Sequence, residues 1–159
     1  MESELEPPVC SIEWLHPEQV DELYRTLEPN FKNNGWLLRE RTPDQILRDI
    51  QEYYVVRVND IIVGVFQLKE SQTEERFLEL GAFVVCTTQK EERRKVKDDI
   101  VHFSIDQSHQ RALELISLTA HPSLSHLYQK NGAEILPSWV FPSREQVSPG
   151  IPIYSFPNI

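Results

Sequence analysis

Four cationic side chains stand close together in the middle of the sequence, at Arg93, Arg94, Lys95 and Lys97. Guanidinium and ammonium groups bind phosphate and carboxylate oxygens, so this basic cluster is a candidate anion site. Acidic residues flank it on both sides and reduce its net charge: Glu91, Glu92, Asp98 and Asp99. Such a mixture of charges is typical of the solvated start of a helix, and we favour that interpretation over an anion site.

The other reactive side chains form no recognisable catalytic or metal-binding pattern. The two cysteines, Cys10 and Cys86, lack Cys-x-x-Cys spacing, so neither a disulfide scaffold nor a zinc site is expected. Cys86 follows an apolar run and is interpreted as a small core residue. The five histidines include no His-x-x-x-His pair, and a Gly-x-Ser-x-Gly motif is absent. We therefore expect no metal.

The basic cluster lies inside the region that organises the rest of the chain. Residues 79–85 are apolar and rich in β-formers, and a charged segment follows them. Apolar residues then recur at helical spacing as far as Ala112, which predicts a long helix with one buried stripe. Residues 113–118 predict a second strand, and a short helix follows. Because a helical crossover joins the two strands, they should run parallel in one sheet.

The chain before residue 79 predicts a strand, two helices and antiparallel strands. Residues 10–15 fit a short strand, and His16-Pro17-Glu18 opens a helix that should end at Glu28-Pro29-Asn30. Thr42-Pro43-Asp44-Gln45 has the arrangement of a capping box and starts the second helix. Residues 54–68 predict a β-hairpin that turns at Asn59-Asp60, and a polar turn leads from it to the strand that contains Glu79.

This order of elements predicts a mixed α/β (α+β) layer with one crossover helix, in a single domain over residues 9–159. Residues 1–8 are acidic and proline-containing, and we expect them to be disordered. Residues 137–159 are rich in proline and predict an extended tail with short edge strands. The tail also contains many apolar side chains, so it should pack on the domain or on a partner.

Charge and hydropathy restrict the class of partner. The net charge of −9 opposes binding to nucleic acid, because phosphate backbones require a basic surface. No apolar run approaches the ~18 residues that cross a membrane, so we expect no membrane partner. The acidic N-terminal residues do not resemble a targeting segment, and a cytoplasmic location is the expectation.

The element order and one short segment resemble the GNAT superfamily of acetyl-CoA-dependent N-acetyltransferases. The segment is Tyr128-Gln-Lys-Asn-Gly132, which is similar to the (F/L)-Y-x-x-x-G-(F/A) pattern of that family. The acetyltransferase domain of bacterial N-acetylglutamate synthase shows a similar helix at 42–52, a similar hairpin at 54–68 and a similar E-x-x-x-x-V strand at 79–84. The resemblance implies a mixed, mostly antiparallel central sheet with flanking helices and a V-shaped splay between the fourth and fifth strands.

The resemblance also implies a cofactor site at the start of the crossover helix. The family binds the pyrophosphate of acetyl-CoA on backbone amides that follow a (Q/R)-x-x-G-x-(G/A) motif. Arg93 and Lys95 replace its two small residues here, so bulky side chains would crowd the phosphates, although the cations could bind phosphate directly. The cofactor-binding residues implied in this way are Val85, Lys90, Arg93, Arg94 and Lys95, with acetyl-CoA as the cofactor if the protein is active.

Two catalytic residues follow from the same resemblance. Glu79 matches a strand-four glutamate that relays a proton from the substrate amine, and a carboxylate can do so when partial burial raises its pKa. The alternative role for Glu79 is a solvated ion pair. Tyr128 matches a tyrosine that protonates the departing thiolate. The alternative role for Tyr128 is that of a core residue that closes the helix over the sheet.

Two functions remain open at this point. The substituted cofactor loop favours a divergent or non-catalytic (pseudo) acetyltransferase, which would act as a protein-binding or regulatory subunit with a protein partner or a homodimer through the C-terminal tail. The alternative is an active acetyl-CoA-dependent N-acetyltransferase on a small amine or amino acid, with Glu79 as base and Tyr128 as acid. The backbone at residues 90–95 discriminates between them, because a normal helix start with open amides favours the enzyme.

Overall fold

A seven-stranded sheet forms the centre of the molecule. The computed structural model describes residues 10–31, 41–71, 76–87, 89–119, 122–137 and 150–156. The strand order is β1-β2-β3-β4-β5-β7-β6, and within these residues only β4 and β5 are parallel to each other. The predicted mixed, mostly antiparallel sheet is therefore confirmed. The strands are β1 (Cys10–Trp14), β2 (Tyr53–Val58), β3 (Ile61–Glu70), β4 (Phe77–Val85), β5 (Glu114–Leu118), β6 (Glu134–Leu136) and β7 (Ile153–Phe156).

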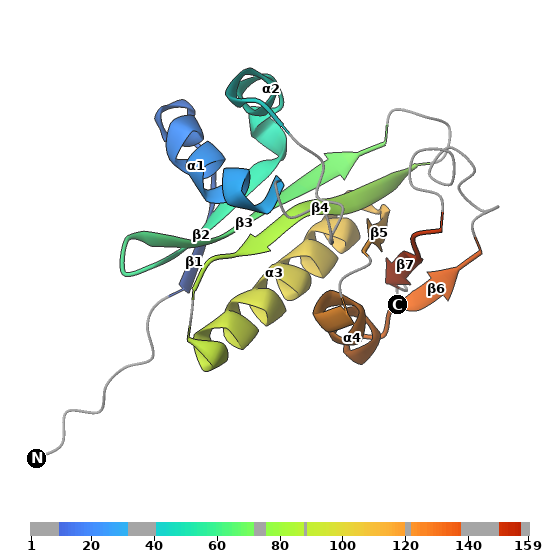
Figure 1. Cartoon of the computed structure of the whole chain (residues 1–159). Coiled ribbons are helices and arrows are strands. Elements are labelled where there is room, and N and C mark those ends of the chain that lie inside the picture. Colours follow the sequence, from blue (N-terminus) through green and yellow to red (C-terminus); the bar gives the residue numbers. More distant parts are fainter. Residues whose placement is uncertain are drawn as a thin grey trace, which may run out of the picture.

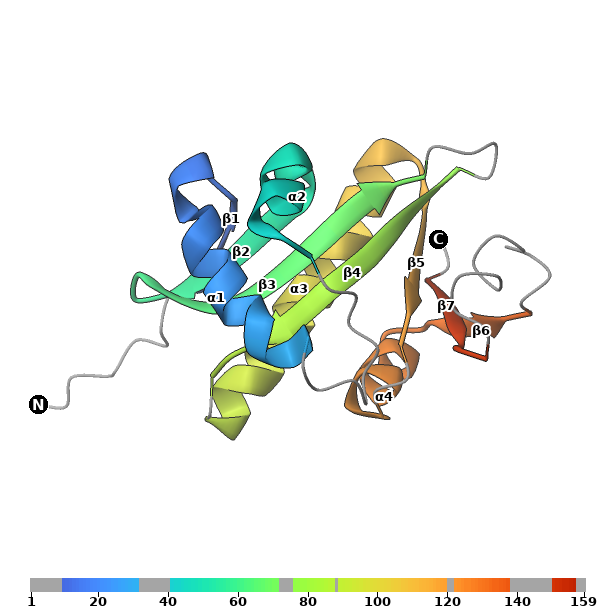
Figure 2. The same cartoon turned by 45° about the horizontal axis from the view of Figure 1, so that its top comes forward.

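Helices cover both faces of this sheet (Figure 1, Figure 2). One face carries α1 (Val20–Phe31), α2 (Pro43–Arg48) and the 3-10 turns η1 (Pro17–Gln19) and η3 (Ile50–Glu52). The other face carries α3 (Lys90–Arg111) and α4 (Pro122–Lys130). Two apolar layers result, one with Leu23 and Val65 under α1, the other with Ile100 and Leu80 under α3. Within the described residues, no helix is long and apolar enough to cross a membrane.

The two N-terminal helices start where the sequence predicts, but α1 ends later. Pro29 lies inside the last turn of α1, which continues to Phe31, one residue beyond the predicted end at Glu28-Pro29-Asn30. A proline inside a helix removes one hydrogen bond and crowds the carbonyl four residues earlier, in keeping with a helix that ends soon after it. The capping box of α2 is confirmed: the Gln45 amide donates to Thr42 Oγ1 over 3.2 Å, and the Thr42 amide donates to Gln45 Oε1 over 2.9 Å.

The hairpin of β2 and β3 turns at Asn59 and Asp60, as predicted. Both residues adopt left-handed backbone angles, with φ of 50° and 66°. A two-residue turn with two positive φ values has the twist that antiparallel strands require. Asn and Asp tolerate this conformation better than other residues that carry a Cβ, so the turn forms without glycine.

A bulge in β4 changes which residues of that strand face α3. Val65 and Gln67 of β3 are two residues apart, while their partners Val84 and Gly81 in β4 are three apart. The extra residue lies next to Ala82, whose φ of 48° is left-handed. Before the bulge Leu80 packs in the α3 layer, and after it Ala82 and Val84 pack in the α1 layer.

β4 and β5 separate soon after they meet. β4 runs to Val85, but only its first four residues pair with β5, and the last pair joins Leu80 to Ser117. The next residue of β5, Leu118, pairs only with Ile153 of β7. The predicted splay between the fourth and fifth strands is therefore confirmed, and we call this point of separation the β4/β5 fork.

Part of the predicted C-terminal tail belongs to the sheet. The residues of β7 are buried between β5 and β6, in line with the prediction that apolar tail residues pack on the domain. Two predictions concern residues outside those that the structure describes. They are the packing of the apolar tail residues Trp139, Val140 and Phe141, and the disorder of residues 1–8. The boundaries 9–159 of the domain remain a prediction.

Gly64 marks the closest approach of α3 to the sheet. A Cβ at this position would lie 3.0 Å from Val96 Cγ1 and 3.4 Å from Ile100 Cδ1. Gly64→Ala is therefore expected to lower the free energy of unfolding by about 1–3 kcal/mol, because α3 must shift to admit the methyl group. Urea denaturation measures this change.

The matched control for this substitution is Gly81→Ala. There a Cβ would meet only Glu79 Oε2, at an ordinary 3.9 Å. The control should change the stability by less than about 1 kcal/mol. Equal losses in the two variants would contradict the tight packing of α3 on Gly64.

Candidate functional site

A basic groove of about 520 Å³ opens between α3 and α4. Asp98 is the one carboxylate among the described residues that line it. In a chain whose net charge is −9, this groove concentrates positive charge at one place and is therefore a candidate anion site. Five cationic side chains line it: Lys90, Arg93, Arg94 and Lys97 from α3, and Lys130 from α4.

The start of α3 at the edge of this groove has ordinary helical geometry. The first hydrogen bond of the helix runs from the Arg93 amide to the Gln89 carbonyl over 2.8 Å. The amides of residues 90–92 therefore precede the helical ladder and point outward from the helix end. The Arg93 side chain turns back along the preceding segment, where its Nε donates to the Thr87 carbonyl over 3.2 Å. The helix start thus combines outward-pointing amides with a guanidinium beside them.

The predicted cofactor-binding residues separate into two groups. Lys90, Arg93 and Arg94 line the groove together, whereas Lys95 pairs with Asp99 along the exposed side of α3 over 2.7 Å. Val85 packs against the apolar layer under α3. Sequence reasoning missed the groove itself, because its second wall comes from Ser123, His126 and Lys130 of α4.

Lys97 lies at the inner side of the groove. Its Nζ donates to Ser123 Oγ over 3.3 Å and so connects α3 with α4. Burial, and after it the neighbouring Arg93 guanidinium, lower the pKa of Lys97 below its usual value. The charged form of Lys97 is therefore less favoured in the folded protein than in the unfolded chain.

Tyr128 occupies the α3 side of the β4/β5 fork. Its side chain is fully buried, with ring centroids 5.5 Å from Tyr154 and 5.3 Å from Phe156. Its hydroxyl lies 2.9 Å from Ser117 Oγ, and Ser117 Oγ donates to the Leu80 carbonyl over 2.9 Å. Burial raises the pKa of Tyr128 well above its ordinary value. The phenol is therefore held neutral.

Glu79 occupies the opposite side of the sheet, just before the bulge. Leu78 and Leu80 face α3, so Glu79 between them faces the α1 side. Its Oε1 is buried, and its Oε2 lies 3.9 Å from the Cβ position that Gly81 leaves vacant. The structure thus brings Glu79 and Tyr128 to the same fork but to different faces of β4.

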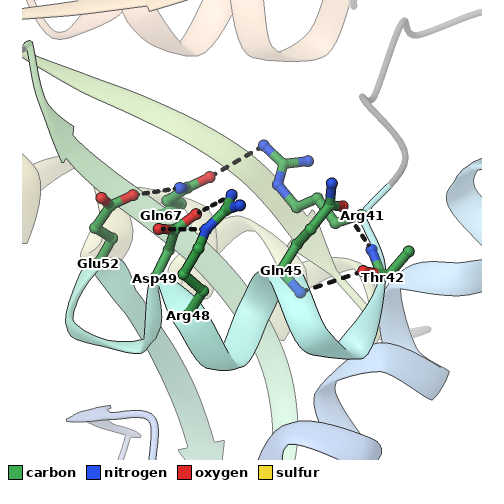
Figure 3. Close-up of polar contacts among 7 residues, drawn as sticks. All are labelled: Arg41, Thr42, Gln45, Arg48, Asp49, Glu52 and Gln67. Atoms are coloured by element: carbon green, nitrogen blue, oxygen red, sulfur yellow. Dashed lines mark hydrogen bonds and ion pairs between the residues drawn. The ribbon is translucent and has the colours of Figure 1, made fainter.

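A polar network lies beside Glu79 on the α1 side of the sheet. Gln67 of β3, directly across from Gly81, is only 7% exposed. Arg41 Nη2 donates to Gln67 Oε1 over 3.0 Å, and Gln67 Nε2 donates to Glu52 Oε1 over 2.7 Å. Figure 3 shows Arg41 and Glu52 reaching Gln67 from the two ends of the α2 segment. Sequence reasoning missed this network; its only signal was one polar residue in the apolar run of β3.

Cys86 does not belong to the core, and that prediction is wrong. β4 ends at Val85, so Cys86 lies beyond the last strand pair, and its side chain is exposed. Its amide still donates to the Val63 carbonyl over 2.8 Å, which fixes the direction of the chain toward α3. Within the described part of the chain, no three metal-ligating side chains cluster.

Neither a protein-family model nor a curated protein matches this sequence, but solved structures match its fold. N-acetylglutamate synthase from Neisseria gonorrhoeae, complexed with coenzyme A and N-acetyl-glutamate, matches with a TM-score of 0.72 and 15% identity over 94% of this chain and 35% of that chain. A GNAT-family acetyltransferase from Staphylococcus aureus Mu50 matches with a TM-score of 0.71 and 17% identity, over 92% of this chain and 98% of that chain.

A third match is Rv2747 from Mycobacterium tuberculosis in complex with CoA, with a TM-score of 0.67 and 12% identity over 94% of this chain and 99% of that chain. All three matches cover more than nine tenths of this chain at TM-scores of 0.67–0.72, so the likeness extends over the whole architecture described above. The chain therefore has the fold of the GNAT acetyltransferases, as the sequence resemblance implied. It spans about a third of the length of the N-acetylglutamate synthase chain.

The lowered pKa of Lys97 leads to a prediction about stability. A base whose pKa is lower in the folded protein destabilises the fold while it is charged in both states, and this cost disappears above the unfolded pKa of about 10.4. Lys97→Met should therefore raise the melting temperature at pH 7. The gain in the free energy of unfolding should stay below about 1 kcal/mol, because the side chain is partly solvated. The gain should vanish above about pH 10.5, because lysine then becomes neutral in both the folded and the unfolded protein.

Thermal unfolding at the two pH values measures the effect. Lys95→Met is the matched control, since it removes a cation that is paired with Asp99 on the exposed side of the helix. It should leave stability unchanged or lower it slightly. A gain that persists at the higher pH would contradict the assignment to Lys97 ionisation.

Proposed function

We propose that this chain is an acetyl-CoA-dependent N-acetyltransferase that acts on a small amine or amino acid. The observation that carries the proposal is the basic groove beside an ordinary helix start. Five cations and the outward-pointing amides of residues 90–92 fit the phosphate groups of a coenzyme A thioester. The thioester would supply an activated acetyl group.

The positions of the two side chains that replace the small residues of the family motif reduce the expected crowding of the phosphates. In this sequence Arg93 and Lys95 replace the small residues, yet Lys95 points along the exposed side of α3 and does not line the groove. Arg93 turns its guanidinium toward Thr87 and presents a planar donor group beside the helix start. Phosphate recognition would therefore depend on side-chain charges more than on close approach of the backbone.

Glu79 is the group in this site that is best placed to act as a base. As the acceptor nitrogen forms its bond to the acetyl carbon, the amine must lose a proton. The half-buried carboxylate of Glu79, next to the bulge and the fork, would take that proton directly or through water. Tyr128 would supply a proton to the departing sulfur.

The acceptor would bind on the α1 side of the sheet. Gln67 holds Arg41 and Glu52 apart, so the two opposite charges are fixed at separate points beside Glu79. Guanidinium groups bind carboxylates with two parallel hydrogen bonds. Arg41 is thus suited to the carboxylate of an amino-acid acceptor, and Glu52 to a positively charged group.

A second function, a non-catalytic acetyltransferase fold that binds a protein, is favoured by one observation. The phenolic proton of Tyr128 is already donated to Ser117 in a sealed environment, which suits a core residue. In this function the basic groove would bind an acidic segment of a partner. The part of the C-terminal tail (residues 137–159) outside the buried strand β7 would contact that partner or a second copy of the chain.

Coenzyme A binding tests the groove first. Acetyl-CoA at millimolar concentration should raise the melting temperature, since a ligand that binds only the folded state stabilises it. Arg94→Gln and Lys130→Gln should each weaken the affinity about tenfold, the typical effect of losing one charge-assisted hydrogen bond. Lys95→Gln, outside the groove, is the matched control and should bind as the unmodified protein does. Absence of any thermal shift would contradict the proposed cofactor.

Acetyl transfer tests the base. Glu79→Gln should lower kcat by about 10²–10⁴ while acetyl-CoA affinity stays the same, because the amide cannot take the proton. Glu70→Gln is the control, because Glu70 is a glutamate at the end of β3 that pairs with Arg111. Release of free thiol, followed with a chromogenic disulfide over a panel of amines and amino acids, gives the rates. Full activity of Glu79→Gln would exclude Glu79 as base.

A further inference from the structure

A chain of three oxygen atoms connects Tyr128 to the β4/β5 fork. It runs from the Tyr128 hydroxyl to Ser117 Oγ and on to the Leu80 carbonyl oxygen, with 2.9 Å between neighbouring atoms. Ser117 is 1% exposed and Tyr128 is 1% exposed, so the chain is closed off from solvent. Leu80 and Ser117 are also the last residue pair that holds β4 and β5 together.

The number of hydrogens fixes the direction of this chain. A carbonyl oxygen can only accept, so Ser117 donates its single hydroxyl hydrogen to Leu80. Ser117 therefore has no hydrogen left for Tyr128, and Tyr128 must be the donor in the bond between their hydroxyls. In the resting protein the Tyr128 O–H bond thus points at Ser117, and the proton needed for a departing sulfur is held inside the protein.

We propose that Ser117 is a positioning residue for Tyr128: its hydroxyl accepts the Tyr128 hydrogen bond in the resting protein and turns from the Leu80 carbonyl to the Tyr128 oxygen when Tyr128 gives its proton away. In that step the phenolic O–H bond breaks and its electron pair stays on the phenolate oxygen. The thioester C–S bond breaks, its electron pair stays on sulfur, and the proton forms the S–H bond of the leaving thiol. The phenolate recovers a proton from water that reaches the fork once the thiol has left.

The rotation of Ser117 would lower the free-energy cost of forming a buried phenolate at Tyr128. Burial disfavours a charged Tyr128, and a neighbouring hydroxyl that can turn and donate to the phenolate offsets part of that penalty. Ser117 opposes the rise in the pKa of Tyr128 that burial causes.

The catalytic purpose rests on the proposed function, but the rotation can be tested without any cofactor. Site-specific incorporation of 3,5-difluorotyrosine at position 128 makes the phenol more acidic, so that its ionisation can be followed by phenolate absorbance before the protein unfolds. Ser117→Ala should then lower the acid dissociation constant of this phenol about tenfold, because the phenolate loses a donor. Ser117→Thr keeps a hydroxyl and should restore the value.

Ser125→Ala is the matched control. Ser125 forms the corresponding serine–tyrosine bond with Tyr154, whose ring packs against Tyr128. Its loss should leave the ionisation of position 128 unchanged. Ser117→Cys, a weaker donor of similar size, provides a second variant should Ser117→Ala fail to fold. An unchanged dissociation constant in Ser117→Ala or Ser117→Cys, or an equal change in Ser125→Ala, would overturn the proposal.

Activity separates this inference from the proposed function. With Tyr128 itself in place, Ser117→Ala should lower kcat about tenfold with KM unchanged, and Ser117→Thr should recover it. A protein that changes its phenol ionisation as expected but transfers no acetyl group would refute the transferase while it supports the Ser117 rotation. An active transferase whose phenol ionisation is indifferent to Ser117 would refute the rotation alone.

Discussion

The separation of β4 from β5 after Leu80 is the constraint on which the rest of the structure depends. The two strands run parallel for four residue pairs, and the bulge at Ala82 then turns β4 away while its pairing with β3 continues. The bulge also exchanges the faces of the strand. Glu79 precedes the bulge and faces the α1 side by strand alternation, while Tyr128 of α4 closes the α3 side, so a carboxylate and a phenol lie on opposite sides of one fork.

The end of β4 also determines where the basic groove lies. The chain leaves β4 at Val85 and enters α3 at Lys90, so the first turns of α3 stand beside the fork and next to α4. Glycine-rich loops bind phosphate mainly through backbone amides, which carry partial charges. Full charges on Arg and Lys side chains act over a longer distance and are screened by salt. If the groove binds phosphate as proposed, side chains in place of glycines would exchange a close fit for electrostatic attraction.

Features encoded by neighbouring residues could be predicted from the sequence. The capping box at Thr42, the hairpin at Asn59-Asp60 and the parallel βαβ unit each follow from a short pattern, and all three are present. Features that depend on distant residues could not. Lys130 joins the basic cluster only because α4 packs beside α3, and Gln67 meets Arg41 and Glu52 only because β3 lies under the α2 segment. The exposure of Cys86 likewise depends on where strand pairing stops, which the apolar run before it did not reveal.

In the proposed function, side-chain cations of the basic groove bind the phosphates of coenzyme A. Isothermal titration of the protein with coenzyme A at several salt concentrations tests it most directly. If the cations bind phosphate, the affinity should fall steeply and log-linearly as salt rises, because each contact between a phosphate and a cation is screened. Affinity that is independent of salt, or no binding at low salt and millimolar coenzyme A, would contradict the claim.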